Sequence, residues 1–189
     1  DIFAKASTDA AYIDVGNGEF GFVSEIDSDI PQTAEPITCN LNRSIDDAVQ
    51  VGDRAFLGNE IVRIEGINRE TNSLVLARGC IDTVPLAHNT QTMLWVYSNI
   101  ASVAESTFAS TQTVDMKLVT HVSQDVLNQD LATVASLALN NRKERPYPPA
   151  NVKINGEYWP DEIETDLVIT WSDRNRLNLS VADWYSPGR

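Results

Sequence analysis

Residues 51–79 read VGDRAFLGNEIVRIEGINRETNSLVLARG, and in this stretch apolar residues recur at strand spacing more than at helical spacing. Alternation with a period of two is typical of β-strands that bury one face, so we predict strands at 55–57, 61–67 and 74–78. The pair Gly58-Asn59 and the polar run NRETNS separate these segments and are typical of turns. The stretch therefore predicts an antiparallel meander.

The segments on either side of this meander also carry strand patterns. AYIDVGNGEFGFVSEI (11–26) predicts two strands joined as a hairpin by the turn at residues 16–18. PITCNL (36–41) and TMLWVY (92–97) predict further short strands. Together these segments predict an all-β fold whose body is an antiparallel sheet or small barrel.

Two patterns compete between residues 114 and 140. VDMKLVTHV (114–122) places Val114, Met116 and Leu118 on one face, which favours a strand. DVLNQDLATVASLALN (125–140) has apolar residues at both helical and strand spacings. We interpret residues 125–140 as a helix, with a strand as the alternative.

The stretch RPYPPANVKINGEYWP (145–160) has the pattern of a seam between domains. Its prolines hold the chain extended, and the following residues include an alternating strand, NVKI. A second strand pattern, TDLVITWS (165–172), places Trp171 on an apolar face that we expect to be buried. Two such strands resemble the start of a fibronectin type III sandwich, which needs about seven strands and about 100 residues.

These patterns give a provisional domain organisation. Residues 1–140 form a β-rich body, residues 141–150 a Pro-rich linker, and residues 151–189 the start of a fibronectin type III-like domain. Because only the first strands of a sandwich fit into 151–189, we expect this last domain to be incomplete.

Charge and hydropathy argue against a nucleic-acid partner and against a membrane span. The chain of 189 residues has a formal net charge of −13, a field that disfavours nucleic acid and anionic lipid as partners. No stretch approaches the ~20 consecutive apolar residues of a membrane span. We therefore expect no nucleic-acid partner and no membrane span.

The sequence marks out no metal or cofactor site. The two cysteines, Cys39 and Cys80, lie in apolar strand-like stretches, which favours reduced and buried thiols. Neither histidine stands near a cysteine at the spacing that zinc sites use. The acidic run EIDSDI (25–30) places three carboxylates on one side, and we interpret it as a solvated loop, with a hard cation such as Ca²⁺ as the alternative.

No catalytic set is expected either. Gly79-Cys80 is the nearest approach to a nucleophile on a tight turn, but it lacks the flanking pattern of a nucleophile elbow, so Cys80 with His88 is not expected to be catalytic. No pair of carboxylates is marked out for glycan hydrolysis.

Aromatic residues are the candidates for contact with a partner or ligand. By alternation we expect Trp95 and Trp171 in the core. Trp159 lies in a turn-like segment and Trp184 in or near a strand-like one, and for neither does the pattern decide between core and surface. The candidate contact residues are Tyr158, Trp159, Trp184 and Tyr185.

The order of the segments resembles a known family. LARGCIDTVPLAH (76–88), RPYPPANVKING (145–156) and ITWSDRNRL (169–177) are similar to motifs of the central tail-tip hub, or host-specificity, proteins of long-tailed bacteriophages. The same resemblance extends to the related large tail protein of gene transfer agents. It covers roughly residues 36–179, and members of the family are several times longer than this chain.

The resemblance implies a non-enzymatic structural module of a phage-type tail tip, located in the virion tail and acting in tail assembly and host attachment. Its implied partners are other copies of the same protein, in a hub that is generally trimeric, and neighbouring tail proteins, with a host-surface receptor or glycan as a further candidate. The alternative is a carbohydrate- or receptor-binding β module of a phage or bacterial surface protein. No cofactor is expected in either case.

Overall fold

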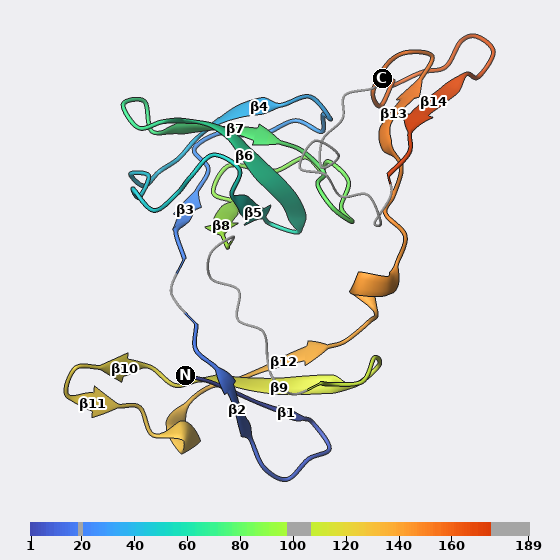
Figure 1. Ribbon diagram of the computed structural model, residues 1–189. Helices are drawn as coiled ribbons and strands as arrows, with labels where there is room; N and C mark the ends of the chain where they lie inside the picture. The colour runs from blue at the N-terminus through green and yellow to red at the C-terminus, as the bar shows by residue number, and fades with distance from the viewer. Residues whose placement is uncertain (19–20, 98–106, 175–189) are drawn as a thin grey trace. The chain divides into compact units, whose positions relative to one another are not determined.

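The computed structural model describes residues 1–18, 21–97 and 107–174 (Figure 1). These residues form fourteen strands and two short 3₁₀ turns, so the predicted all-β class is confirmed. The chain divides into two compact units. Unit 1 comprises residues 1–20 and 100–145, and unit 2 comprises residues 21–99 and 146–189. The domain boundaries expected at residues 140 and 150 stay a prediction.

Unit 2 is built around an antiparallel six-stranded sheet, which curls into a half-barrel (Figure 1). Its strands follow the order β3 (Val23–Glu25), β8 (Met93–Val96), β5 (Arg54–Leu57), β6 (Glu60–Asn68), β7 (Ser73–Ala77) and β4 (Ile37–Asn40). The predicted meander is β5, β6 and β7. Beyond the ends of the edge strands β3 and β4, Ile26 and Leu41 form a β-bridge, so the two edges of the sheet meet.

The concave side of this sheet holds the main hydrophobic core. Leu57, Ile64, Leu74, Leu76 and Leu94 all have 0% exposure and belong to one cluster. Burying a leucine or isoleucine side chain contributes about 1.5–3 kcal/mol. This core fixes the positions of β6 and β7, and with them the loop that follows β7.

A separate two-stranded hairpin in unit 2 pairs β13 (Ala150–Ile154) with β14 (Ile169–Ser172). Asn155 closes it locally, since its side-chain oxygen accepts a hydrogen bond from the Val168 N–H at 2.8 Å. Of the described residues 146–174, none is buried.

The structure contradicts the expected core positions of two tryptophans. Trp171 is 59% exposed, because no second sheet covers the β13–β14 pair among the described residues. Trp95 is 50% exposed, because its neighbours Leu94 and Val96 occupy the inward-facing positions of β8. Both errors concern which face of a strand is covered, which alternation alone does not determine.

Unit 1 contains a four-stranded antiparallel sheet formed from both ends of its sequence. The order is β12 (Val134–Ala138), β9 (Thr113–Leu118), β1 (Ile2–Ala6) and β2 (Ile13–Gly16). The smaller elements are the pair β10 (His121–Val122) and β11 (Asp125–Val126) and the 3₁₀ turns η1 (Gln129–Leu131) and η2 (Arg142–Glu144). Unit 2's sheet is therefore inserted, in sequence, between β2 and β9.

Two further predictions are wrong in this unit. Residues 125–140 are not a helix: they form β11, η1 and β12, because the free edge of β9 offers a pairing partner to all five residues of β12. The hairpin predicted for residues 11–26 does not form either. β2 pairs with β1 and β3 with β8, so the two strands belong to different sheets.

Within the part of the chain that the structure describes, no helix is long and apolar enough to cross a membrane.

Candidate functional site

The loop that follows β7 is anchored to the sheet by a buried ion pair. Glu60 starts β6 and Arg78 follows β7, and both side chains are 0% exposed. β6 and β7 are antiparallel neighbours in which Arg63 lies opposite Ala77. The register therefore places the start of β6 next to the end of β7. The two charged side chains meet at this end of the strands.

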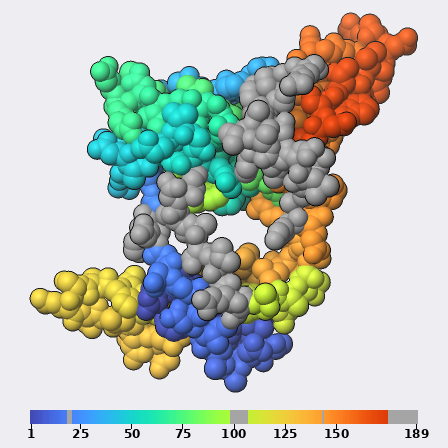
Figure 2. Space-filling model, viewed as in Figure 1, coloured from blue at the N-terminus to red at the C-terminus, as the bar shows by residue number. Residues whose placement is uncertain are grey.

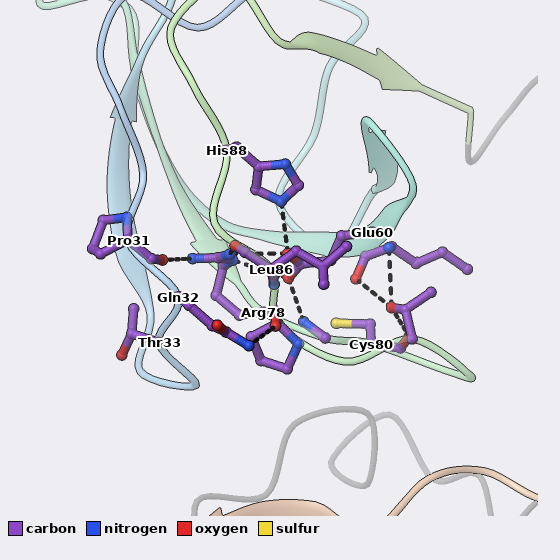
Figure 3. Close-up of polar contacts among 12 residues, drawn as sticks. Pro31, Gln32, Thr33, Glu60, Arg78, Cys80, Leu86 and His88 are labelled. Atoms are coloured by element: carbon purple, nitrogen blue, oxygen red, sulfur yellow. Dashed lines mark hydrogen bonds and ion pairs between the residues drawn. The ribbon is translucent and has the colours of Figure 1, made fainter. Parts of the chain in front are cut away.

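Glu60 accepts hydrogen bonds on both of its carboxylate oxygens (Figure 3). Arg78 binds it bidentately, with Nε 2.9 Å from Oε1 and Nη2 2.9 Å from Oε2. His88 Nε2 lies 2.8 Å from Oε2. The backbone N–H groups of Gly79 and Leu86 donate at 2.6 Å and 2.9 Å. One carboxylate thus holds both ends of the segment 78–88; we call these three side chains, Glu60, Arg78 and His88, the carboxylate cluster.

Arg78 extends the same network to the backbone. Its Nη1 donates to the Pro31 carbonyl at 3.1 Å, and its Nη2 also donates to the Leu86 carbonyl (Figure 3). Two buried charges cost several kcal/mol each to desolvate, and only a bidentate pair with further hydrogen bonds offsets that cost. Burial alone would raise the pKa of Glu60, but the hydrogen bonds from His88 and Arg78 outweigh burial and hold this pKa below its usual value.

Gly79 is required by the tight path of the loop. Its φ is +55°, in the left-handed region, and an added Cβ would lie 2.8 Å from the Pro85 backbone nitrogen and closer still to the Pro85 ring. Ile81 also has a positive φ, of 57°, which is rare for a β-branched residue. The loop therefore keeps a strained path that the carboxylate cluster fixes at both ends.

This arrangement does not activate Cys80 as a nucleophile. Cys80 is 0% exposed and its Sγ lies 3.7 Å from the Ala77 carbonyl oxygen. Burial, as the largest cause, raises the pKa of the Cys80 thiol to about 12, so almost no thiolate exists at neutral pH. The ring nitrogen Nε2 of His88 is engaged with Glu60. Cys39 is likewise buried and forms no disulfide. Burial is the largest cause that raises the pKa of its thiol to about 12.

A hollow in unit 2 brings together two of the candidate contact residues. Its volume is about 70 Å³, and Tyr158 and Trp159 line it together with Pro85 and Pro149. The two aromatic rings are stacked, with centroids 5.7 Å apart. Trp159 is 43% exposed and has a φ of 46°. The exposed side chains of this hairpin region lie on the surface drawn in orange to red in Figure 2.

The same hollow is lined by two guanidinium groups that differ in their partners. Arg78 is neutralised by Glu60. Arg174 donates through Nη1 to the carbonyls of Ile81 and Thr83, at 3.1 Å and 3.4 Å. Burial, as the main cause, lowers the pKa of Arg174. Among the residues that the structure describes, no carboxylate pairs with Arg174.

The remaining candidate residues are not brought to this site. Trp184 and Tyr185 lie outside the described residues. In the acidic loop, Asp29 Oδ1 accepts a hydrogen bond from the Thr90 N–H at 2.7 Å. No group of three or more metal-ligating side chains is found in residues 1–18, 21–97 and 107–174. The geometry of the described residues therefore does not support the alternative of a cation bound at the acidic loop.

The sequence interpretation missed the carboxylate cluster and Arg174. A partial signal was present: antiparallel pairing of 61–67 with 74–78 brings Glu60 and Arg78 to the same end of the two strands, although it does not show that their side chains meet. Nothing in the sequence indicated that Arg174 would reach the carbonyls of residues 81 and 83.

Comparisons with known proteins add no assignment. No protein-family model matches the chain, and a search of the curated proteins finds no match.

Proposed function

We propose that this chain is a non-enzymatic structural module of a phage-type tail tip, of the hub or host-specificity kind, acting in tail assembly and host attachment. The observation that carries the proposal is the use of the segment LARGCIDTVPLAH (76–88), the stretch with the most specific resemblance. Two side chains of this segment, Arg78 and His88, both bind Glu60 and anchor the loop.

This use of the motif favours a building block over an enzyme. A general acid, base or nucleophile needs a group with hydrogen-bonding capacity directed at a substrate. Glu60 already accepts five hydrogen bonds, and Cys80 is a buried thiol with a raised pKa. A loop held this rigidly suits a module that contacts neighbours through shape.

Unit 1 offers a surface for such neighbours. All five residues of β12 are exposed, and among the described strands β12 pairs with β9 alone. Val134 is 46% exposed and Leu137 52% exposed. A free strand edge with apolar side chains is a template for pairing with another chain. We assign this edge to contacts with other copies of the protein or with neighbouring tail proteins.

The test is made in assembled tails. We expect electron microscopy of tails that carry the full-length parent protein to place residues 36–140 in the tip, around the tail axis. Leu137→Lys should reduce the yield of assembled tails, because it puts a charge on the β12 edge. The matched control Val51→Lys, at a 58% exposed position of unit 2, should leave the yield unchanged. A position of this segment away from the tip, or cleavage of peptidoglycan by the purified chain, would contradict the proposal.

The second candidate is a carbohydrate- or receptor-binding β module of a phage or bacterial surface protein. The stacked pair Tyr158 and Trp159 beside a surface hollow favours it, because aromatic faces pack against the C–H faces of sugar rings. A glycan-binding screen with the intact chain and with Trp159→Ala tests this candidate: binding that depends on Trp159 is the expected result.

A further inference from the structure

The hollow beside Tyr158 and Trp159 combines features that point to one chemical class of ligand. Its apolar lining includes Pro85 and Pro149, and its aromatic wall is the stacked pair. Small-molecule sites are typically apolar with a few fixed polar groups that set orientation. Here the group with unused capacity is the guanidinium of Arg174, because Nε and Nη2 have no hydrogen-bond partner among the described residues.

The comparison of the two lining arginines shows what Arg174 lacks. Arg78 uses Nε and Nη2 in a bidentate pair with a carboxylate. Within the part of the chain that the structure describes, Arg174 donates through Nη1 alone, to two carbonyl oxygens that carry no formal charge. A partly buried cation is normally paired, and a planar guanidinium fork matches a carboxylate bidentately. Among the described residues, the second guanidinium of the hollow therefore has no counterpart to the carboxylate that pairs with the first.

The volume of the hollow limits what enters it. At about 70 Å³ it is several times larger than the ~10–15 Å³ that one water requires, and much smaller than a drug-sized pocket of about 300 Å³ or more. A carboxylate or another small substituent of a sugar ring fits inside. Trp159, at 43% exposure, offers a surface for that ring.

We propose that the hollow binds the carboxylate of an acidic sugar, with the carboxylate on Arg174 and the sugar ring on Tyr158 and Trp159. The inference rests on the proposed role in host attachment and names the ligand class. Asn151, which accepts a hydrogen bond from the Tyr158 hydroxyl, holds the aromatic wall in place.

The test uses the intact chain and two matched probes, an oligosaccharide that contains glucuronic acid and its carboxyl-reduced neutral counterpart. Isothermal titration should show at least about tenfold tighter binding of the acidic probe, since a charge-assisted bidentate contact is lost in the neutral one. Arg174→Gln should remove this preference and Arg174→Lys should retain part of it. Arg43→Gln, at an exposed position, is the matched control and should change nothing.

Arg174 also contacts the backbone of the loop, so a second variant separates binding from folding. Trp159→Ala leaves the Arg174 contacts in place and should weaken both probes by a similar factor while leaving the unfolding midpoint nearly unchanged. Equal affinity for the two probes, or an unchanged preference in Arg174→Gln, would overturn the inference. Binding of acidic peptides with the same dependence on Arg174, in place of the sugar, would also overturn it.

The outcome is separable from that of the proposed function. Tails that carry Arg174→Gln should assemble at the normal yield and lose only attachment to cells with acidic capsules. If the parent protein is absent from tails, the tail-tip proposal fails even when the sugar binds. If tails assemble and the sugar does not bind, only the ligand inference fails.

Discussion

The six-stranded sheet of unit 2 and the β13–β14 hairpin have the same kind of sequence pattern and opposite burial. In β7, Leu74 and Leu76 are both 0% exposed. In β14, Ile169 is 47% exposed and Trp171 59% exposed. The sheet curls until its edges meet, so that its concave face covers itself, whereas the hairpin has two strands and no opposing layer among the described residues. Alternation thus shows that a strand has an apolar face, and the topology decides whether that face is covered.

The two regions also treat their charges differently. Next to the sheet, Glu60 and Arg78 satisfy each other in full burial. At the end of the hairpin, the hydrogen bonds of Arg174 to other described residues go to neutral carbonyls. The sheet is therefore expected to carry the stability of unit 2, and the hairpin to present groups for contact. The following experiments test this division, in order of decreasing expected effect.

The largest effect is expected for Glu60→Gln. Removing this carboxylate leaves the Arg78 guanidinium buried without a counter-ion, which costs about 3–5 kcal/mol of unfolding free energy. The control Glu65→Gln removes a partner from the partly exposed pair with Arg63, where about 1 kcal/mol or less is expected. Urea unfolding measures both. Similar losses for the two variants would show that the carboxylate cluster is not the anchor of the loop.

The next effect is that of Leu76→Ala in the core. Truncating a fully buried leucine costs about 2–5 kcal/mol through lost burial and the remaining cavity. Leu167→Ala, at a position 58% exposed before β14, should change stability by no more than about 0.5 kcal/mol. The same denaturant titration distinguishes them. A large loss for Leu167→Ala would mean that the hairpin has a covered face after all.

Two glycines with positive φ provide a third pair. Gly79→Ala brings a Cβ into the Pro85 ring, and Gly156→Ala, at φ +88°, meets no atom within 4 Å. Both variants bear the strain of the backbone conformation, and only the first adds overpacking, at about 1–3 kcal/mol. Thermal unfolding should therefore show the lower midpoint for Gly79→Ala. Equal midpoints would argue against the close Gly79–Pro85 approach.

The dependence of the unfolding free energy on acid pH tests whether the ionised Glu60 stabilises the fold. The pKa of Glu60 is lowered in the folded chain, so its stabilising contribution is fully present above the unfolded value of about 4.3 and is lost as pH falls through the lower folded value. Stability of the unmodified chain should therefore fall between pH 5 and acid denaturation more steeply than that of Glu60→Gln. Parallel pH profiles would contradict this assignment.

The smallest effect concerns the thiols. With the pKa of Cys39 and of Cys80 raised to about 12, neither should react with a disulfide reagent at pH 8 in the native chain. Both should react at once in denaturant. Rapid reaction of one thiol in the native state would show that the strand carrying it opens readily.

Much of the strand content and the pairing within the meander followed from the sequence, and the pairing of the other strands did not. The meander at 51–79 was predicted because its strands are adjacent in sequence and joined by clear turns. The partner of β2 was missed although β1 directly precedes it in sequence, because the turn predicted at residues 16–18 joined β2 to the following strand. The pairing of β12 with β9 was missed because an apolar run such as LATVASLAL fits a helix equally well. Of the contact residues, Tyr158 and Trp159 do line one hollow, but Arg174 enters it only through tertiary structure.

The insertion of the six-stranded sheet within unit 1 has a consequence for folding order. β1 pairs with β9, with Ile2 opposite Leu118, so forming this pair closes a loop that contains most of the chain's residues. In the inserted sheet, Val23 lies opposite Trp95. If β3 and β8 pair first, only residues 3–22 and 96–117 remain to be closed, which lowers the loop-closure entropy cost by about 1 kcal/mol. We therefore expect the inserted sheet to fold before the sheet that encloses it in sequence.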